Sequence, residues 1–143
     1  GMAFSRLNRL EEAAQAFEKA LELDPEYAIA HNNLGAVFHR QNRLEEALTY
    51  YSRAAELDPA YVSAHNNRGL IFAARQQFDP AAEAFKAALA LDPSFVQAHV
   101  NLGATLAWQG KKEEAIKHLT QALRLDPDNA KARQNLKTLQ AQP

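Results

Sequence analysis

Apolar and polar residues alternate along most of the chain with the three- and four-residue spacing of an α-helix. The stretch 44–57 shows this clearly, since its apolar positions form one face: Leu44, Ala47, Leu48, Tyr51, Ala54, Ala55 and Leu57. Such a stripe predicts an amphipathic helix that packs its apolar side against other helices. Similar stripes predict helices at about 28–40, 62–74 and 96–108, and at about 44–56, 78–90 and 112–124. The predicted fold is therefore all-α.

An Asp-Pro pair recurs every 34 residues, beginning at Asp24, Asp58, Asp92 and Asp126. Proline cannot continue a helix and disfavours helical geometry in the residue before it. Each pair therefore marks the end of one helix and the approach to the next. Pro80 lies outside this series, and we expect Asp79 to cap a helix N-terminus with Pro80 at the first helical position.

Other residue types keep the same 34-residue interval, without insertion or deletion. Small residues form three columns and bulky residues form one: Gly35, Gly69 and Gly103; Ala13, Ala47, Ala81 and Ala115; Ala20, Ala54, Ala88 and Ala122; and Phe17, Tyr51, Phe85 and Leu119. An internal repeat of this kind predicts a solenoid, in which a helix pair buries its apolar face only by stacking on its neighbours.

These columns resemble the tetratricopeptide repeat (TPR) family over nearly the whole chain. The resemblance rests on the Leu-Gly pairs at Leu34 and Leu102, the large residues Phe38, Phe72 and Leu106, both alanine columns and the terminal proline. It implies a right-handed α-solenoid of antiparallel helix pairs, each with an A-type helix followed by a B-type helix.

On this basis residues 1–143 form a single TPR domain with uneven ends. We expect a partial repeat at 1–27, full repeats at 28–61, 62–95 and 96–129, and a capping helix within 130–143. The partial repeat should keep a short A-type remnant at about 2–8 and a B-type helix at about 10–22. Apolar residues near this end, such as Phe4, Leu7, Phe17 and Leu21, would then lack a covering helix.

Composition and charge exclude several classes of protein. The 143 residues are 47% hydrophobic and 23% charged, as in an ordinary globular domain. The net charge of −1 argues against a basic nucleic-acid-binding protein. No apolar run approaches the roughly 18 residues of a membrane span, no signal peptide is evident, and cysteine is absent. We therefore expect a cytoplasmic protein with neither a membrane nor a nucleic acid as partner.

The chain carries no motif of an enzyme, such as a phosphate-binding glycine loop, a zinc-protease helix or a nucleophile elbow. We expect no catalytic residue, no cofactor and no metal. His31, His65 and His99 lie one repeat apart, so roughly 8–10 Å of helix packing separates them and one ion cannot join them. Packing or hydrogen bonding within each repeat is the expected role, with a pH-sensitive contact as the alternative. His39 and His118 are expected at the surface.

Asparagine recurs at one position of every A-type helix: Asn33, Asn67, Asn101 and Asn135, with Asn32 and Asn66 preceding two of them. Asparagine is a mediocre helix former, so propensity does not explain the column. Its amide can donate to and accept from an extended peptide backbone. The column resembles the asparagine ladder of the O-linked N-acetylglucosamine transferase superhelix, which implies a sequence-tolerant grip on peptide backbone. The alternative is that the amides bond to neighbouring helices or to water.

Charge is distributed unevenly between the two helix types. We call the ranges 28–41, 62–75, 96–109 and 130–141, which contain the A-type helices, the A-type windows. They hold six cations and no acid: Arg40, Arg68, Arg75, Lys131, Arg133 and Lys137. All 17 acidic residues lie on B-type helices or in loops. Since TPR proteins line their concave groove with A-type helices, the groove should attract an acidic segment or a C-terminal carboxylate.

Family geometry also places Leu70, Val100 and Trp108 in the groove or at its rim, among alanines that leave room for a partner side chain. Trp108 could instead pack beneath the capping helix. The carboxylate clamp of chaperone-binding TPR domains is not expected, because Ala36, Leu70 and Asn135 stand where the clamp needs other polar or basic residues.

We therefore expect a non-enzymatic adaptor that binds an extended, acidic or C-terminal peptide in the A-type groove. The predicted contact residues are Asn33, Asn67, Asn101, Asn135, Asn32, Asn66, Arg40, Leu70, Val100, Trp108 and Lys131. The alternative is an assembly scaffold that forms a homo-oligomer through its open N-terminal edge.

Overall fold

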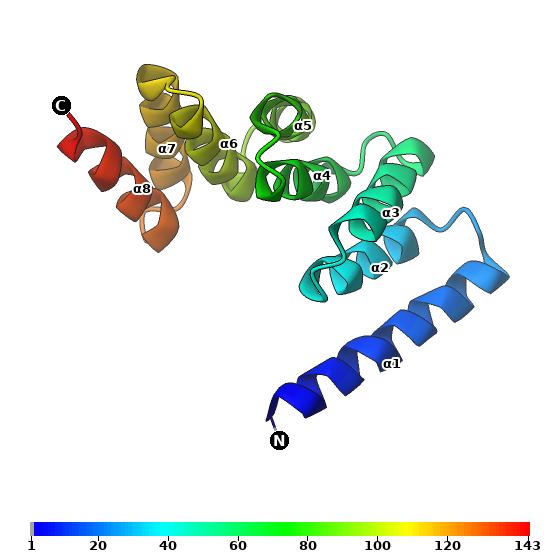
Figure 1. The fold of residues 1–143 in the computed structure, drawn as a ribbon. Helices are drawn as coiled ribbons and strands as arrows, with labels where there is room; N and C mark the ends of the chain where they lie inside the picture. Colours follow the sequence, from blue (N-terminus) through cyan, green and yellow to red (C-terminus); the bar gives the residue numbers. More distant parts are fainter. Residues whose placement is uncertain (1) are drawn as a thin grey trace. The chain divides into compact units, whose positions relative to one another are not determined.

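The computed structural model describes residues 2–143, with side chains from residue 8 onward, as α-helices joined by short turns (Figure 1). Eight helices and no strand are found in these residues: α1 (Met2–Leu23), α2 (Ala28–Arg40), α3 (Leu44–Leu57), α4 (Val62–Ala74), α5 (Phe78–Leu91), α6 (Val96–Trp108), α7 (Lys112–Leu125) and α8 (Ala130–Ala141). The all-α helical-repeat fold is confirmed. The A-type helices α2, α4 and α6 have the predicted bounds, and each B-type helix runs one residue further than predicted.

The helices form two compact units, Gly1–Ile71 and Phe72–Pro143, and the boundary falls within α4. In the first unit α2 pairs with α3, and α1 packs against α2. In the second unit α6 pairs with α7, α5 packs against α6, and α8 packs against α7. The contacts between neighbouring helices bury the apolar stripes.

In each unit, a bulky residue of the B-type helix is buried against a glycine of the A-type helix with which it pairs. The first core contains Leu34, Phe38, Ala47, Tyr51 and Ile71, and the second buries Phe85, Leu102, Leu106 and Leu119. A Cβ atom added to Gly35 would lie 2.8 Å from Tyr51 Cδ1, and one added to Gly103 would lie 2.7 Å from Leu119 Cγ. Both distances are shorter than real Cβ contacts, so the close approach of the two helices requires glycine there.

The Asp-Pro pairs build one recurring turn. Asp24, Asp58 and Asp92 each accept a hydrogen bond at Oδ1 from the backbone N–H two residues later, at 2.9–3.1 Å. Their carbonyl oxygens, and that of Asp126, accept from the N–H three residues later. Aspartate thus closes the turn with its side chain while proline stops the preceding helix, which explains why the pair recurs.

The turns inside the full repeats share a left-handed residue at one position: Asn42 (φ 61°), Gln76 (φ 58°) and Gly110 (φ 75°). The next N–H donates back across the turn to the carbonyl of Phe38, Phe72 or Leu106, at 2.9 Å in each case. This is the Schellman pattern, which satisfies carbonyls at the end of the A-type helix.

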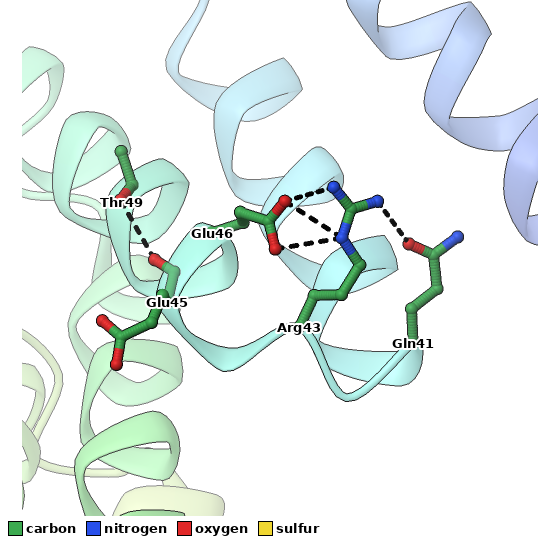
Figure 2. Close-up of polar contacts among 5 residues, drawn as sticks. All are labelled: Gln41, Arg43, Glu45, Glu46 and Thr49. Atoms are coloured by element: carbon green, nitrogen blue, oxygen red, sulfur yellow. Dashed lines mark hydrogen bonds and ion pairs between the residues drawn. The ribbon is translucent and has the colours of Figure 1, made fainter.

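The Arg43 side chain forms hydrogen bonds to residues on both sides of it in the turn between α2 and α3, as Figure 2 shows. Its Nε donates to Glu46 Oε1 at 3.0 Å and to Oε2 at 2.9 Å, its Nη2 also donates to Oε1, and its Nη1 donates to Gln41 Oε1 at 3.3 Å. The guanidinium also lies 4.3 Å from the centre of the Phe38 ring. The hydrogen bond from Arg43 holds the pKa of Glu46 below its usual value. Because Arg43 and Glu46 are about half exposed, the pair orients the turn more than it stabilises the fold.

Two details differ from the sequence-based expectations. The first repeat has no break between an A-type remnant and a B-type helix, because α1 is continuous from Met2 to Leu23. Asn8 shares a column with the left-handed Asn42, yet it is helical and its Nδ2 donates to Glu12 Oε1 at 3.0 Å. The Asn8 side chain bonds one turn further along the same helix, and its backbone does not take the left-handed conformation of Asn42.

The second difference concerns α5. Gln77, not Asp79, is the N-cap residue, and Pro80 is the third residue of the helix. The proline is tolerated because the first backbone N–H groups of a helix have no intrahelical acceptor. Within residues 2–143, no helix is both long and apolar enough to cross a membrane.

Candidate functional site

The four asparagines of the column differ in the hydrogen bonds that their side chains make. Asn67 Nδ2 donates to Asn32 Oδ1 at 3.0 Å, so this amide is used between α4 and α2. Asn101 also has an interaction within the fold. Between residues 8 and 143, no hydrogen bond engages the half-buried side chains of Asn33 and Asn135. The first and last members of the column are therefore the ones with available amides.

Three predicted contact residues are buried and share one column of the repeat. Asn32 is 7% exposed, Asn66 5% and Val100 3%. Burial argues against a ligand contact at these three residues, because packed helices enclose their side chains. Successive residues of an α-helix point about 100° apart, so the residue before each asparagine of the column lies on a different face of the helix.

Asn33 and Arg40 border an open pocket between α1 and α2, which we call the N-terminal pocket. It has a volume of about 830 Å³ and is lined by Arg9, Leu10, Ala13, Phe17, Asn33, Ala36, Val37 and Arg40. No acidic residue lines it, and neither Arg9 nor Arg40 has an ion-pair partner among the described residues. The pocket thus combines two unpaired cations, an available amide and the apolar ring of Phe17.

Trp108 and Asn135 border a second pocket between α6, α7 and α8, which we call the C-terminal pocket. It has a volume of about 320 Å³ and is lined by Ala104, Ala107, Trp108, Leu119, Asn135, Thr138, Leu139 and Gln142. The Trp108 side chain is 76% exposed and stacks on Phe78, with ring centres 6.0 Å apart and planes 1° from parallel. Trp108 is therefore not covered by the capping helix α8.

The two pockets occupy the same place in the repeat. Asn33, Ala36, Val37 and Arg40 lie three repeat lengths before Asn135, Thr138, Leu139 and Gln142, and Phe17 stands in the same relation to Leu119. In the C-terminal pocket, α6 supplies Ala104, Ala107 and Trp108. No A-type helix pairs with α1 among the described residues, which leaves the N-terminal pocket larger.

The remaining predicted contact residues lie outside both pockets. Leu70 is half-buried on α4, and Lys131 is exposed at the start of α8. Of the cations in the A-type windows, Arg133 donates to the Pro127 carbonyl oxygen at 2.7 Å and Arg75 also has a partner.

Arg9, Leu10 and Thr138 line the pockets but were not among the predicted contact residues. Their position relative to Asn33 and Asn135 in the repeat was the signal that could have identified them.

The histidine column has a structural role. Nε2 of His31, His65 and His99 lies 2.8–2.9 Å from the carbonyl oxygen of the proline six residues earlier, and Arg133 makes the equivalent bond in α8. Because a carbonyl oxygen only accepts, Nε2 carries the proton in each ring. The expected hydrogen bonding within the repeat is confirmed. Among the described residues, no group of three or more potential metal ligands comes together.

His118 contradicts the expectation of an isolated surface residue. Its Nδ1 lies 3.0 Å from Nδ1 of His99. Burial lowers the pKa of His118, and the neighbouring His99 lowers it further. The signal was the repeat column, since His118 occupies the position of Tyr50, whose ring centre is 5.9 Å from that of His31.

Known structures share this fold. The first TPR domain of Spaghetti (RPAP3), bound to an HSP90 peptide, is 26% identical with a TM-score of 0.79, and the match covers 82% of this chain and 93% of that one. The second TPR domain of human RPAP3, in complex with an HSP70 peptide, is 26% identical with a TM-score of 0.77, covering 80% and 96%. MamA is 21% identical with a TM-score of 0.83, covering 91% and 76%, and shows likeness of fold alone.

Sequence comparison identifies the repeat itself. No curated protein sequence matches the chain. The tetratricopeptide repeat family model matches residues 1–62 and 66–130, which is most of the chain. The 34-residue interval, the paired helices and this match agree, and the chain belongs to the tetratricopeptide repeat family, whose domains are protein-interaction modules.

Proposed function

We propose that this TPR domain is a non-enzymatic adaptor that binds an extended acidic segment of a partner protein along its A-type helices. The observation that carries the proposal is the pairing of available amides with pockets. Asn33 and Asn135 have no hydrogen-bond partner within residues 8–143, and each borders a pocket next to apolar surface. An amide so placed can both donate to and accept from a peptide backbone.

The charge of the N-terminal pocket favours an acidic ligand. Arg9 and Arg40 line it, and no acidic residue is among its described lining residues. Guanidinium groups bind carboxylates through two parallel hydrogen bonds, which are stronger than bonds between neutral groups. A glutamate, an aspartate or a C-terminal carboxylate of the partner would therefore bind here, while Asn33 holds the adjoining backbone.

The C-terminal pocket supplies an apolar contact. Trp108 presents its ring at the rim, and Ala104 and Ala107 leave space beside it. Exposed aromatic residues of this kind often dominate the binding energy of an interface once a partner covers them. We assign Trp108 as the contact for an apolar side chain of the partner and Asn135 as the contact for its backbone.

Two similar structures support an acidic ligand. Their bound peptides, SRMEEVD and SGPTIEEVD, both end in Glu-Glu-Val-Asp. This chain has Ala36, Leu70 and Asn135 where the carboxylate clamp would need other residues. We therefore propose a different grip on a similar class of ligand, based on Arg9, Arg40 and the two available asparagines.

The test is a binding screen with a library of acidic, neutral and basic peptides of equal length. Trp108 is the one tryptophan of the chain, so its fluorescence reports directly on the C-terminal pocket. Asn33→Ala with Asn135→Ala should weaken the selected acidic peptide about tenfold or more, because each removes a bond to the ligand. Gln140→Ala, exposed on α8, is the matched control and should bind like the wild type.

A charge reversal tests whether the preference for acidic peptides is electrostatic or whether the pocket binds peptides regardless of their charge. Arg40→Glu should weaken acidic peptides and improve basic ones, because it changes the charge of the N-terminal pocket. Equal affinity of all variants for the selected peptide would contradict the proposal, as would a library with no acidic preference.

The size of the N-terminal pocket favours a second candidate, self-association through α1. Leu10, Ala13 and Phe17 line the pocket between α1 and α2, where the described residues supply no A-type helix on the other side of α1, and Leu23 is 84% exposed. The helix α8 of another copy does not fit there as an A-type helix, because Lys137 occupies the column of Gly35 and Gly103. Any self-association would therefore use another face, such as α1 against α1.

Sedimentation velocity at several protein concentrations tests this candidate. Leu10→Glu should dissociate the oligomer, whereas Lys112→Glu, at the equivalent position three repeats later, should not. A monomer at every concentration would exclude self-association through α1 and leave peptide binding as the proposed function.

A further inference from the structure

A cluster of cationic and polar side chains surrounds the pair of His99 and His118, apart from both pockets described above. The cavity has a volume of about 340 Å³ and is lined by His99, Lys117, His118, Thr120, Gln121 and Arg124. We call it the basic pocket. It shares no lining residue with the C-terminal pocket.

The hydrogen bonds of His99 determine how the pair holds its protons. His99 is 8% exposed, and its Nε2 donates to the Pro93 carbonyl oxygen at 2.8 Å. In the neutral pair, Nδ1 of His99 must therefore accept, and Nδ1 of His118 must donate across the 3.0 Å between them. Nε2 of His118 remains able to take up one proton without loss of either bond. A second proton would place hydrogens on both Nδ1 atoms, so the pair gains a single positive charge.

The charges around His118 favour an anion over a cation. Lys117 and Glu114 of α7, His99 of α6 and Lys86 of α5 act on it. Lys86 is paired with Glu83 at 3.0 Å. Lys117 and Arg124 have no ion-pair partner within residues 8–143, and no acidic residue lines the cavity. The unpaired charge facing the cavity is therefore positive.

This combination occurs in one repeat alone. At the position of His118 the other full repeats have Tyr50 and Ala84, at that of Lys117 they have Thr49 and Glu83, and at that of Arg124 they have Glu56 and Ala90. The packing of the repeat therefore does not require these side chains, since α2 and α3 pair without them.

We propose that the basic pocket binds a tetrahedral oxyanion of the phosphate class, and that uptake of one proton by the His99–His118 pair strengthens the binding. Lys117 and Arg124 supply positive charge, and the Thr120 hydroxyl and Gln121 amide supply neutral donors. Charge-assisted bonds to an oxyanion are the strong class of hydrogen bond. Burial lowers the pKa of His118, so its added charge appears at mildly acidic pH.

Sulfate is the first probe, because its charge stays constant across the pH range in which histidine titrates. Titration of the full chain, followed by NMR of the α7 amides and of the histidine rings, should saturate. Binding should be at least about threefold tighter near pH 5.5 than near pH 7.5. By linkage, saturating sulfate should raise the pKa of His118. A linear, unsaturated response, or the same affinity at both pH values, would overturn the proposal.

Variants assign the site. Lys117→Gln with Arg124→Gln should weaken sulfate about tenfold, whereas Lys111→Gln, outside the pocket at the start of α7, should not. His118→Gln should keep the affinity found near pH 7.5 and lose its increase at lower pH. Circular dichroism confirms that each variant is folded. Wild-type affinity in the folded Lys117/Arg124 variant would refute the site.

Two further ligands distinguish the source of the oxyanion. Inorganic phosphate and a short phosphoserine peptide are compared with the same peptide lacking the phosphate. Tighter binding of the phosphopeptide than of free phosphate would identify a phosphorylated partner, and equal binding would identify the free ion as the ligand. Equal binding of the unphosphorylated peptide would contradict the proposal.

Discussion

The side-chain amide of Asn67 donates a 3.0 Å hydrogen bond to Oδ1 of Asn32, which is 7% exposed. The bond joins α4 to α2, from the asparagine column of one repeat to the buried column before it in the preceding repeat. It gives Asn67 a structural partner that Asn33 and Asn135 lack within the described residues. Asparagines of the same column thus differ in their roles. Asn67 has an asparagine of the preceding A-type helix as its acceptor, whereas Asn33 and Asn135 do not.

Asn67→Ala is expected to destabilise the fold, and Asn33→Ala is not. Removing the Asn67 amide leaves the buried Asn32 oxygen without its donor, at a cost of about 1–3 kcal/mol. Asn33 is half-buried beside an open pocket, and its replacement should change the free energy of unfolding by less than about 0.5 kcal/mol. Urea denaturation followed by circular dichroism measures both. Equal costs for the two variants would contradict the distinction.

Gln76→Gly should stabilise the protein. Gln76 has φ of 58°, a left-handed conformation that costs a side-chain-bearing residue roughly 1 kcal/mol and costs glycine little. Gly110 already occupies this position in the next turn. The expected gain in the free energy of unfolding is about 0.5–1 kcal/mol.

Gly110→Ala is the matched opposite and should lose a similar amount. No atom lies within 4 Å of a Cβ placed on Gly110, so the loss would come from backbone conformation and not from a clash. Thermal unfolding of both variants tests the pair, and a change of the same sign in both would refute the explanation.

The sequence predicted the repeat register well because its signals are local. Each Asp-Pro pair closes a turn with its own side chain and backbone, so the position of the pair sets where one helix ends and the next begins. The bounds of α2, α4 and α6 followed from this pattern. The continuous α1 did not, because residue type alone does not set the turn: Asn8 is helical although it shares a column with the left-handed Asn42.

The candidate site was harder to predict because the face of each side chain depends on neighbouring helices. Asn32 and Asn33 are adjacent, yet Asn32 is buried and Asn33 lines a pocket. Composition cannot separate them, since both are asparagine and both lie at helix interior positions. Likewise, 19 residues separate His99 from His118, and the contact arises only when α6 pairs with α7.

Gly103→Ala should destabilise the second unit although alanine is the better helix former. The new Cβ would lie 2.7 Å from Leu119 Cγ, which forces α6 and α7 apart or moves the leucine from its preferred rotamer. Overpacking of this kind costs about 1–3 kcal/mol, more than the roughly 1 kcal/mol that replacing a helix-interior glycine returns.

A double-mutant cycle tests the cause. Leu119→Ala alone leaves a cavity, while Gly103→Ala combined with Leu119→Ala removes the clash with the leucine and leaves only a 3.2 Å contact to the Ala115 carbonyl oxygen, so the two costs should not add. The double variant should be more stable than the sum by at least about 0.5 kcal/mol. Additive costs would mean that Leu119 is not the residue that requires glycine at position 103.

Acidification below about pH 6.5 should destabilise the fold, owing to His39 and His118. Burial lowers the pKa of both residues below 6.5, and Arg40 lowers that of His39 further. The unfolded chain therefore binds more protons than the folded chain just below pH 6.5, so the free energy of unfolding falls as the pH decreases through that value. The loss levels off below the folded-state pKa values.

Urea denaturation in a buffer free of phosphate and sulfate, at several pH values, measures this slope. His39→Gln combined with His118→Gln should flatten it, since neither side chain then titrates. The pKa values of Glu46 and Asp92 lie below their ordinary values of 4.5 and 3.8 because of hydrogen bonds, so these groups lose their stabilising effect only at lower pH. Their contribution therefore stays outside the histidine window. An unchanged slope in the double variant would show that other groups cause the acid sensitivity.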